Sequence, residues 1–226
     1  MKAKHNTKNA GFSLVELMIA MVITLVLLGI ASELFSRALS VRARESRKVD
    51  ALASAQAALN VMSREIANSG FGIVGAGTTT QPSNGIIIAD SGANRIHIRS
   101  NFDNTGDYVM GPGSTVLATN RPGEDITYFF DAATDSIVRY DPNAPTGTPT
   151  TSVIINRISN VTFRYYHYTQ GSSTFTDGAT PTVGTGRVRI TVLARLDPVA
   201  GQPDNQQVEF TSDVTLRNSN YMLQQY

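Results

Sequence analysis

The chain has 226 residues, a formal net charge of +1 at neutral pH and no cysteine. The near-neutral charge is unlike that of a strongly basic nucleic-acid binder, and without cysteine the chain has no disulfide, thiolate metal ligand or cysteine nucleophile. Its four lysines all lie within the first 48 residues, so lysine Schiff-base chemistry is excluded from the rest of the chain.

A membrane-spanning helix is predicted close to the start of the chain. Residues 1–11 carry three lysines and no acid, and residues 12–31 are apolar except for Ser13, Glu16 and Thr24. As a helix rising about 1.5 Å per residue, this apolar run is roughly 30 Å long, the thickness of a bilayer core. An ordinary secretory signal has a shorter apolar region followed by a small-residue cleavage site, and no such site follows here.

Glu16 is the unusual residue of this apolar run. A carboxylate in a membrane helix is energetically costly and usually functional. If cleavage made Phe12 the first residue, Glu16 would lie one helical turn from a free amine, near the positive end of the helix dipole. The terminal amine of a neighbouring subunit could then neutralise Glu16; a tolerated interfacial glutamate is the alternative.

The helical pattern continues beyond the apolar run, so residues 32–70 are predicted to form an amphipathic helix. Apolar residues recur at seven-residue spacing with others beside them, which predicts one stripe that packs on a sheet. The stripe comprises Leu52, Ala55, Leu59, Met62 and Ile66. We expect the helix to end at Ser69-Gly70, because glycine favours the left-handed helix cap.

Residues 71–226 are predicted to form one β-rich globular domain. Short β-rich runs alternate with stretches rich in Gly, Pro, Thr and Asn, which are expected to be loops. The candidate strands are Gly85–Ala89, Arg95–Arg99, Ile126–Phe130, Ser136–Tyr140, Val153–Ile155, Val161–Tyr168, Arg187–Leu196 and Gln207–Leu216, and the loops are 101–123, 141–151 and 170–185. The predicted fold class is therefore α+β, a long N-terminal helix packed on an antiparallel β-sheet.

Two of these strands alternate clearly between apolar and other residues, as half-buried antiparallel strands do. Their predicted inward residues are Val161, Phe163 and Tyr165 in one strand, and Val188, Ile190, Val192 and Ala194 in the other. Tyr166 then faces away from Tyr165, which predicts core packing for one ring and edge packing for the other.

No motif predicts a catalytic residue, a cofactor or a metal site, so the chain is not expected to be an enzyme. Gly70–Gly75 matches G-x-G-x-x-G, but a helix precedes it where a dinucleotide site needs a strand. Asp103–Asp107 offers oxygen ligands without the spacing of an EF-hand, so a polar turn is favoured over calcium. His97 and His167 have no zinc-type spacing and are expected to be surface or hydrogen-bonded histidines.

The string Gly11-Phe12-Ser13-Leu14-Val15-Glu16-Leu17, after a short basic leader, resembles the cleavage motif of type IV prepilins and pseudopilins. The resemblance implies that prepilin peptidase cuts between Gly11 and Phe12 and N-methylates Phe12. It also implies that Glu16 guides docking into the growing filament.

The β-rich region resembles one branch of the type IV pilins, the PilW family of minor pilins. The resemblance rests on the run from Ile158 to Tyr165, on Arg187–Leu196 and on the closing stretch Val214–Asn218. It implies a subunit that helps initiate pilus assembly near the tip and supports piliation, twitching motility or adhesion. The implied partners are other minor and major pilins and the inner-membrane assembly platform. The implied location is a single-pass inner-membrane protein with a periplasmic C-terminal domain, later incorporated into the pilus.

Two other functions stay open, and one observation conflicts with the implied orientation. The alternatives are a type II secretion pseudopilin of the J type and, from another class, an anchored periplasmic enzyme or ligand-binding domain. The conflict is the basic run Arg37–Lys48, which follows the apolar segment although positive charge normally stays on the cytoplasmic side. Lipid head groups, acids of adjacent subunits or plain solvation are the candidate explanations for this run.

Overall fold

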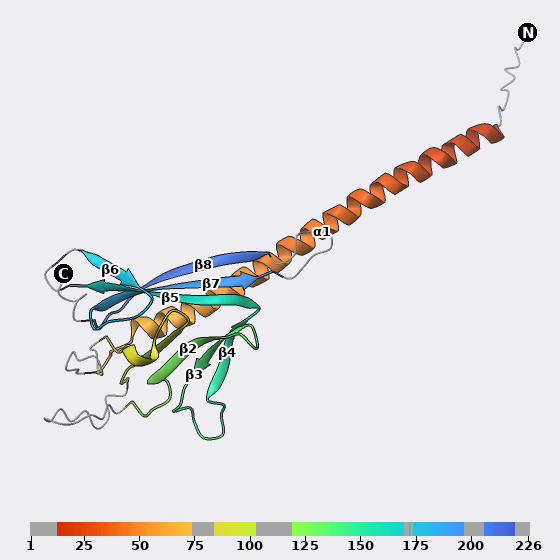
Figure 1. Ribbon diagram of the computed structural model, residues 1–226. Helices are drawn as coiled ribbons and strands as arrows, with labels where there is room; N and C mark the ends of the chain where they lie inside the picture. The colour runs from red at the N-terminus through yellow and green to blue at the C-terminus, as the bar shows by residue number, and fades with distance from the viewer. Residues whose placement is uncertain are drawn as a thin grey trace, which may run out of the picture. The chain divides into compact units, whose positions relative to one another are not determined.

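The computed structural model of the chain describes residues 13–73, 84–102, 119–169, 172, 174–196 and 206–219. Gly11 and Phe12 lie outside the described residues, as does the candidate calcium segment Asp103–Asp107. The chain divides into two compact units, of which the first contains the helix up to Ser46 and the second begins at Arg47. Figure 1 labels the long helix and most of the strands.

Helix α1 runs from Leu14 to Ala67. No proline interrupts it, and Ala, Leu, Met, Arg and Glu, all good helix formers, make up much of its length. The predicted stripe is confirmed at Ala55, Leu59, Met62 and Ile66, all buried, whereas Leu52 is 43% exposed and lies outside the core.

The end of α1 is closed by residues from the far end of the chain. Gly70 has a φ of 77°, the left-handed conformation predicted for the cap. The backbone N–H of Arg217 donates to the carbonyl of Ala67 at 3.0 Å, and the Asn218 side chain donates to the carbonyl of Ser69, also at 3.0 Å. The first of these donors satisfies a helix carbonyl that has no partner within the helix, and the second satisfies a carbonyl of the turn that follows.

The first sheet has the order β1-β2-β3-β4, with every pair antiparallel. Its strands are β1 (Arg95–Arg99), β2 (Asp125–Asp131), β3 (Ser136–Tyr140) and β4 (Thr151–Asn156). The predicted strand Gly85–Ala89 is wrong: Ile86 forms only an isolated bridge with Ile98, and a short 3-10 helix, η1, follows at Ile88–Asp90. The reason is the turn at Gly85, whose φ is 72°, followed by the coil of η1.

The second sheet has the order β6-β5-β7-β8, again antiparallel throughout. Its strands are β5 (Ile158–Tyr168), β6 (Phe175–Gly178), β7 (Thr185–Arg195) and β8 (Gln207–Thr215). β6 was not predicted, because its four residues fall within the segment 170–185, expected to be a loop. Its sequence FTDG has turn character, and its strand conformation depends on pairing with β5.

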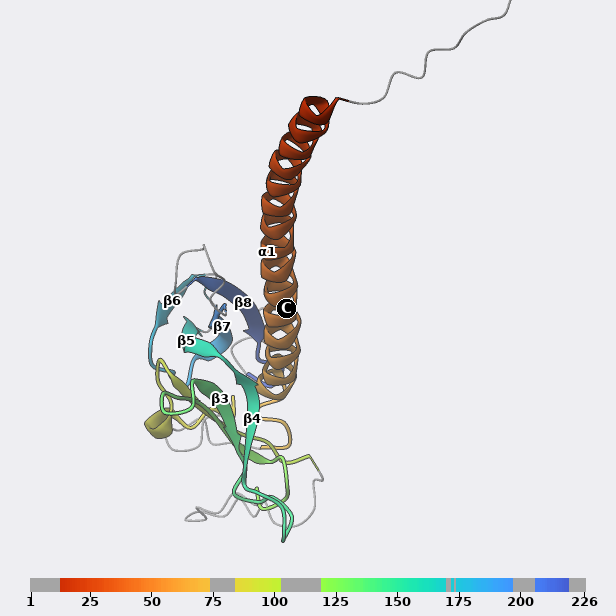
Figure 2. The same ribbon diagram turned by 90° about the vertical axis from the view of Figure 1, so that its right-hand side faces the viewer.

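A single residue separates the two sheets along the chain. Arg157 lies between β4 and β5 and has a φ of 59°, a left-handed conformation that turns the chain between them. The expectation of one sheet is therefore corrected to two four-stranded sheets, which Figures 1 and 2 both show as separate groups of strands.

The core lies where the second unit's part of α1 meets the inner faces of both sheets. The residues predicted to point inward from β5 and β7 are all buried: Val161, Phe163, Tyr165, Val188, Ile190, Val192 and Ala194. Side chains from both sheets join the helix stripe in one apolar cluster. The α+β fold class is thus confirmed, with a helix packed on antiparallel sheets.

Candidate functional site

The first unit presents an apolar helix surface that nothing in the described chain covers. The large apolar side chains from Leu14 to Ile30 are all more than half exposed. By length and composition, α1 is the one helix among the described residues that could cross a membrane, and none of its apolar stretch is buried. An apolar surface of this extent marks a membrane or protein contact.

Glu16 lies in the first turn of this apolar helix. The helix begins after Ser13, whose carbonyl accepts the backbone N–H of Leu17 at 3.1 Å. The Glu16 side chain is exposed and has no hydrogen bond or ion pair with any described residue. A carboxylate here complements the positive end of the helix dipole and is available to a cation of another molecule.

Apart from Glu16, the described residues of the apolar stretch offer no ionisable side chain. The hydroxyl of Thr24 donates to the carbonyl of Ala20 at 2.7 Å, so this polar group is satisfied within the helix. A Cβ added at Gly29 would meet no atom within 4 Å. Glu16 is therefore the one ionisable group that the described part of this stretch offers to a partner.

The basic run after the apolar stretch is mostly solvent-facing. Arg37 pairs with Glu33 at 2.5 Å across one helical turn, and both side chains are largely exposed. Arg42 and Lys48 are exposed, whereas Arg44 is partly buried. An exposed pair of this kind contributes about 0.3–0.5 kcal/mol, so the run does little for stability.

His97 proves to be a hydrogen-bonded histidine, as expected. Its Nδ1 lies 2.8 Å from Oδ2 of Asp90, and its Nε2 lies 2.6 Å from Oδ1 of Asp125. Burial alone would raise the pKa of Asp125, but the hydrogen bond with His97 and the charge of Arg99 outweigh it and lower that pKa. No group of His, Asp or Glu in the described residues could hold a metal ion. Sequence reasoning missed both aspartates, which come from different elements.

His167 is likewise a hydrogen-bonded histidine. Its Nδ1 lies 3.0 Å from the hydroxyl of Thr182 and 3.1 Å from that of Thr185. Burial lowers the pKa of His167, although the charge of Asp177 acts in the opposite direction. This histidine holds the turn that enters β7.

Tyr165 and Tyr166 divide between core and edge as predicted. The Tyr165 ring is fully buried, and its hydroxyl donates to the carbonyl of Gly92 at 3.0 Å. The Tyr166 ring packs against Phe175 of the edge strand β6, and the guanidinium of Arg187 lies 4.1 Å from its centroid. Sequence reasoning found the two faces but missed Arg187, because this contact depends on the pairing of β5 with β7.

Comparison with known proteins identifies the N-terminal segment. Residues 6–32 match the prokaryotic N-terminal methylation motif. No curated protein and no solved structure matches the chain. The matched segment includes Glu16 and the exposed apolar part of the helix, and the motif supports a type IV pilin-like or pseudopilin-like subunit of a structural kind. Such a motif implies processing by prepilin peptidase and membrane assembly with other pilins.

Proposed function

We propose that this chain is a minor type IV pilin of the PilW kind, a structural subunit that helps initiate pilus assembly. The observation that carries the proposal is the methylation motif at residues 6–32, which covers a helix start with an exposed carboxylate and an uncovered apolar surface. In this proposal prepilin peptidase cuts between Gly11 and Phe12 and methylates the new amine of Phe12.

The physical basis of assembly is exchange of one apolar environment for another. In the membrane the apolar side chains contact lipid; in a filament they contact the helices of neighbouring subunits. Lipid and helix surfaces are similarly apolar, so close packing and polar contacts decide the association. An amine–carboxylate contact between Phe12 of one subunit and Glu16 of another would fix the register, because an unpaired charge at that position is costly.

In the proposed arrangement the subunit spans the inner membrane once and carries its β-rich domain in the periplasm. It then joins the pilus at or near the tip with other minor and major pilins, after contact with the assembly platform. The positive run Arg37–Lys48 opposes this orientation on charge count alone, and we propose that the processing motif overrides it.

Two substitutions test the proposal. Gly11→Ala should leave an uncut, unassembled precursor, whereas Glu16→Gln should be cut normally but enter filaments poorly. Glu33→Gln is the matched control, because Glu33 is exposed on the same helix beyond the apolar run. Processing and filament incorporation are read by immunoblot of membrane and sheared fractions. Normal processing and assembly of Gly11→Ala would contradict the proposal.

Deletion of the chain separates the minor pilin from the J-type pseudopilin, since both share the N-terminal motif. Loss of pili and twitching with normal secretion supports the minor pilin. Loss of secreted enzymes with normal pili supports the pseudopilin and overturns the assignment to the pilus.

A further inference from the structure

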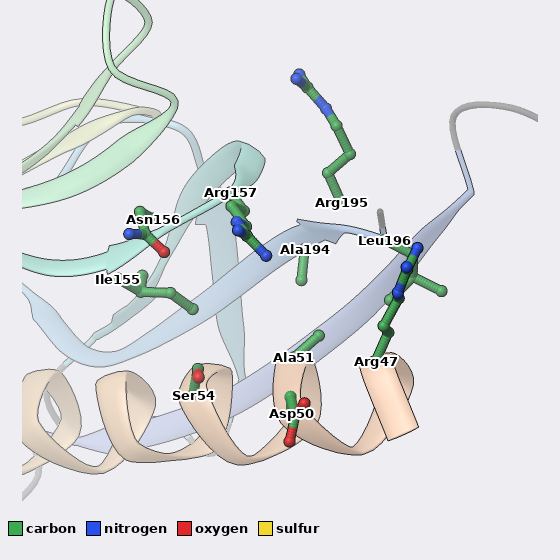
Figure 3. A pocket seen from close by; sticks show the side chains of 10 residues that line it. All are labelled: Arg47, Asp50, Ala51, Ser54, Ile155, Asn156, Arg157, Ala194, Arg195 and Leu196. Atoms are coloured by element: carbon green, nitrogen blue, oxygen red, sulfur yellow. The ribbon is translucent and has the colours of Figure 1, made fainter. Parts of the chain in front are cut away.

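A cavity of about 290 Å³ lies within the second unit, between α1 and the ends of β4 and β7 (Figure 3). Ala51 of the helix and Ala194 of β7 line it with small side chains, which leaves the space open. The rest of its lining includes Arg47, Arg157 and Arg195, and Asp50 is its one acid. A small pocket with three guanidinium groups and one carboxylate favours an anion.

The three arginines hold different positions around this space. Arg47 and Arg157 lie on either side of Ala194, whereas Arg195 extends away from the helix (Figure 3). Arg195 is held by Asp135, whose Oδ2 lies 2.8 Å from its Nη1. Arg47 and Arg157 also have other interactions within the protein. A guanidinium has five N–H donors and can contact more than one carboxylate.

The backbone at Arg157 gives a second, independent reason to assign a role to its side chain. Its φ of 59° is unfavourable for any residue but glycine, asparagine or aspartate. The conformation is fixed because the Arg195 N–H donates to the carbonyl of Arg157 at 2.8 Å. Glycine would suit this turn better, so an arginine here calls for a function of its guanidinium.

We infer that this pocket binds a carboxylate side chain of an adjacent filament subunit, with Arg47 and Arg157 as its main donors. The inference rests on the proposed function, because it needs a filament. Planar guanidinium groups bind carboxylates through paired, charge-assisted hydrogen bonds. All three arginines are exposed to a partner.

A protein carboxylate is favoured over a lipid phosphate by the length of chain involved. About 24 Å of helix separates Ala31, the last residue of the apolar run, from Arg47, at about 1.5 Å per residue. The headgroup layer adds only about 5–8 Å to each side of the hydrocarbon core. A carboxylate on a neighbouring filament subunit is not confined to the headgroup layer, so its contact with Arg47 does not depend on the distance from the membrane.

Site-specific cross-linking in cells tests this inference on the full chain. A photo-reactive residue replaces Ser54, which lines the cavity from α1, and the linked peptide is identified by mass spectrometry. We expect attachment to an acidic segment of another filament subunit, and a drop of about tenfold or more in yield with Arg157→Gln or Arg47→Gln. Arg164→Gln is the control, because Arg164 is exposed on β5 and pairs with Asp177.

The variant Arg157→Gly distinguishes loss of the guanidinium contact from loss of the folded structure. It removes the guanidinium but suits the positive φ, so the chain should fold at least as stably while the cross-link is lost. Attachment to lipid, or a yield unchanged by Arg157→Gly, overturns the inference. If cleavage after Gly11 and filament incorporation are normal in those cells, the proposed function survives that result. A chain that is neither cut nor incorporated overturns both.

Discussion

The hydroxyl of Tyr128 on β2 donates a hydrogen bond to Oε2 of Glu65 on α1. The same carboxylate oxygen accepts Nε–H of Arg139 on β3 at 3.1 Å, so one glutamate ties the helix to two strands of the first sheet. Burial, together with the nearby charge of Glu65, raises the pKa of Tyr128, which therefore remains a donor. The contact fixes where the helix stripe meets the sheet.

Glu65→Ala should lower the free energy of unfolding by about 2 kcal/mol. The substitution leaves the Tyr128 hydroxyl and the half-buried Arg139 without their shared acceptor, and an unmet buried polar group is costly. The control is Asp213→Asn, which breaks an exposed pair with Arg189 and should cost clearly less stability than Glu65→Ala. Denaturant unfolding of both variants measures the difference, and equal losses would contradict this reading.

Asn84→Asp should destabilise the second unit strongly, by about 3 kcal/mol. The fully buried amide of Asn84 donates to the carbonyls of Thr182 and Thr185, at 3.2 and 3.0 Å, while its Oδ1 accepts the N–H of Ile86. A carboxylate has no N–H donors and would face those carbonyls as a buried charge. Thermal unfolding measures the loss, and a melting temperature close to that of the unaltered chain would rule this account out.

Gly85→Ala should prevent stable folding, whereas Gly92→Ala should have little effect. A Cβ at Gly85 would overlap the backbone nitrogen of Gly70 and the carbonyl oxygen of Arg99, and its φ of 72° adds strain. A Cβ at Gly92 would meet nothing within 4 Å. Expression level and circular dichroism of the two variants compare these outcomes. A well-folded Gly85→Ala chain would contradict the close backbone packing described for this turn.

The Asp125 carboxylate should stabilise the fold fully above about pH 4 and progressively less as the pH falls below that value. Its pKa is lower in the folded chain than the value of about 3.9 expected when unfolded, so this stability is lost as the pH falls through the folded pKa. Asp125→Asn should therefore cost stability at pH 5, and the difference from the unaltered chain should shrink between pH 4 and pH 2. Denaturant unfolding across this range measures it. A constant difference would be inconsistent with a lowered pKa.

Local patterns were sufficient for much of this fold. Short β-rich runs predicted Arg95–Arg99 and Ser136–Tyr140 with the same ends that β1 and β3 have. Long-range contacts explain the failures. β6 depends on pairing with β5, and the division into two sheets depends on the left-handed Arg157, a residue type with no turn preference.

The candidate site was predictable for a different reason. Glu16 is recognised from neighbours in the sequence, because the processing motif and the apolar run are both contiguous. The arginine-lined cavity combines residues from three distant segments, around positions 47, 157 and 195, and no local pattern joins them. The contacts of His97 with Asp90 and Asp125 were missed for the same reason.

The N-terminal residue of the mature chain tests the central claim most directly. The chain would be isolated from membranes of cells that contain prepilin peptidase, and its first peptide analysed by mass spectrometry. The account predicts a chain that begins at Phe12 and carries one methyl group on its amine. A chain that retains Met1 to Gly11, or that begins at another residue, would contradict it.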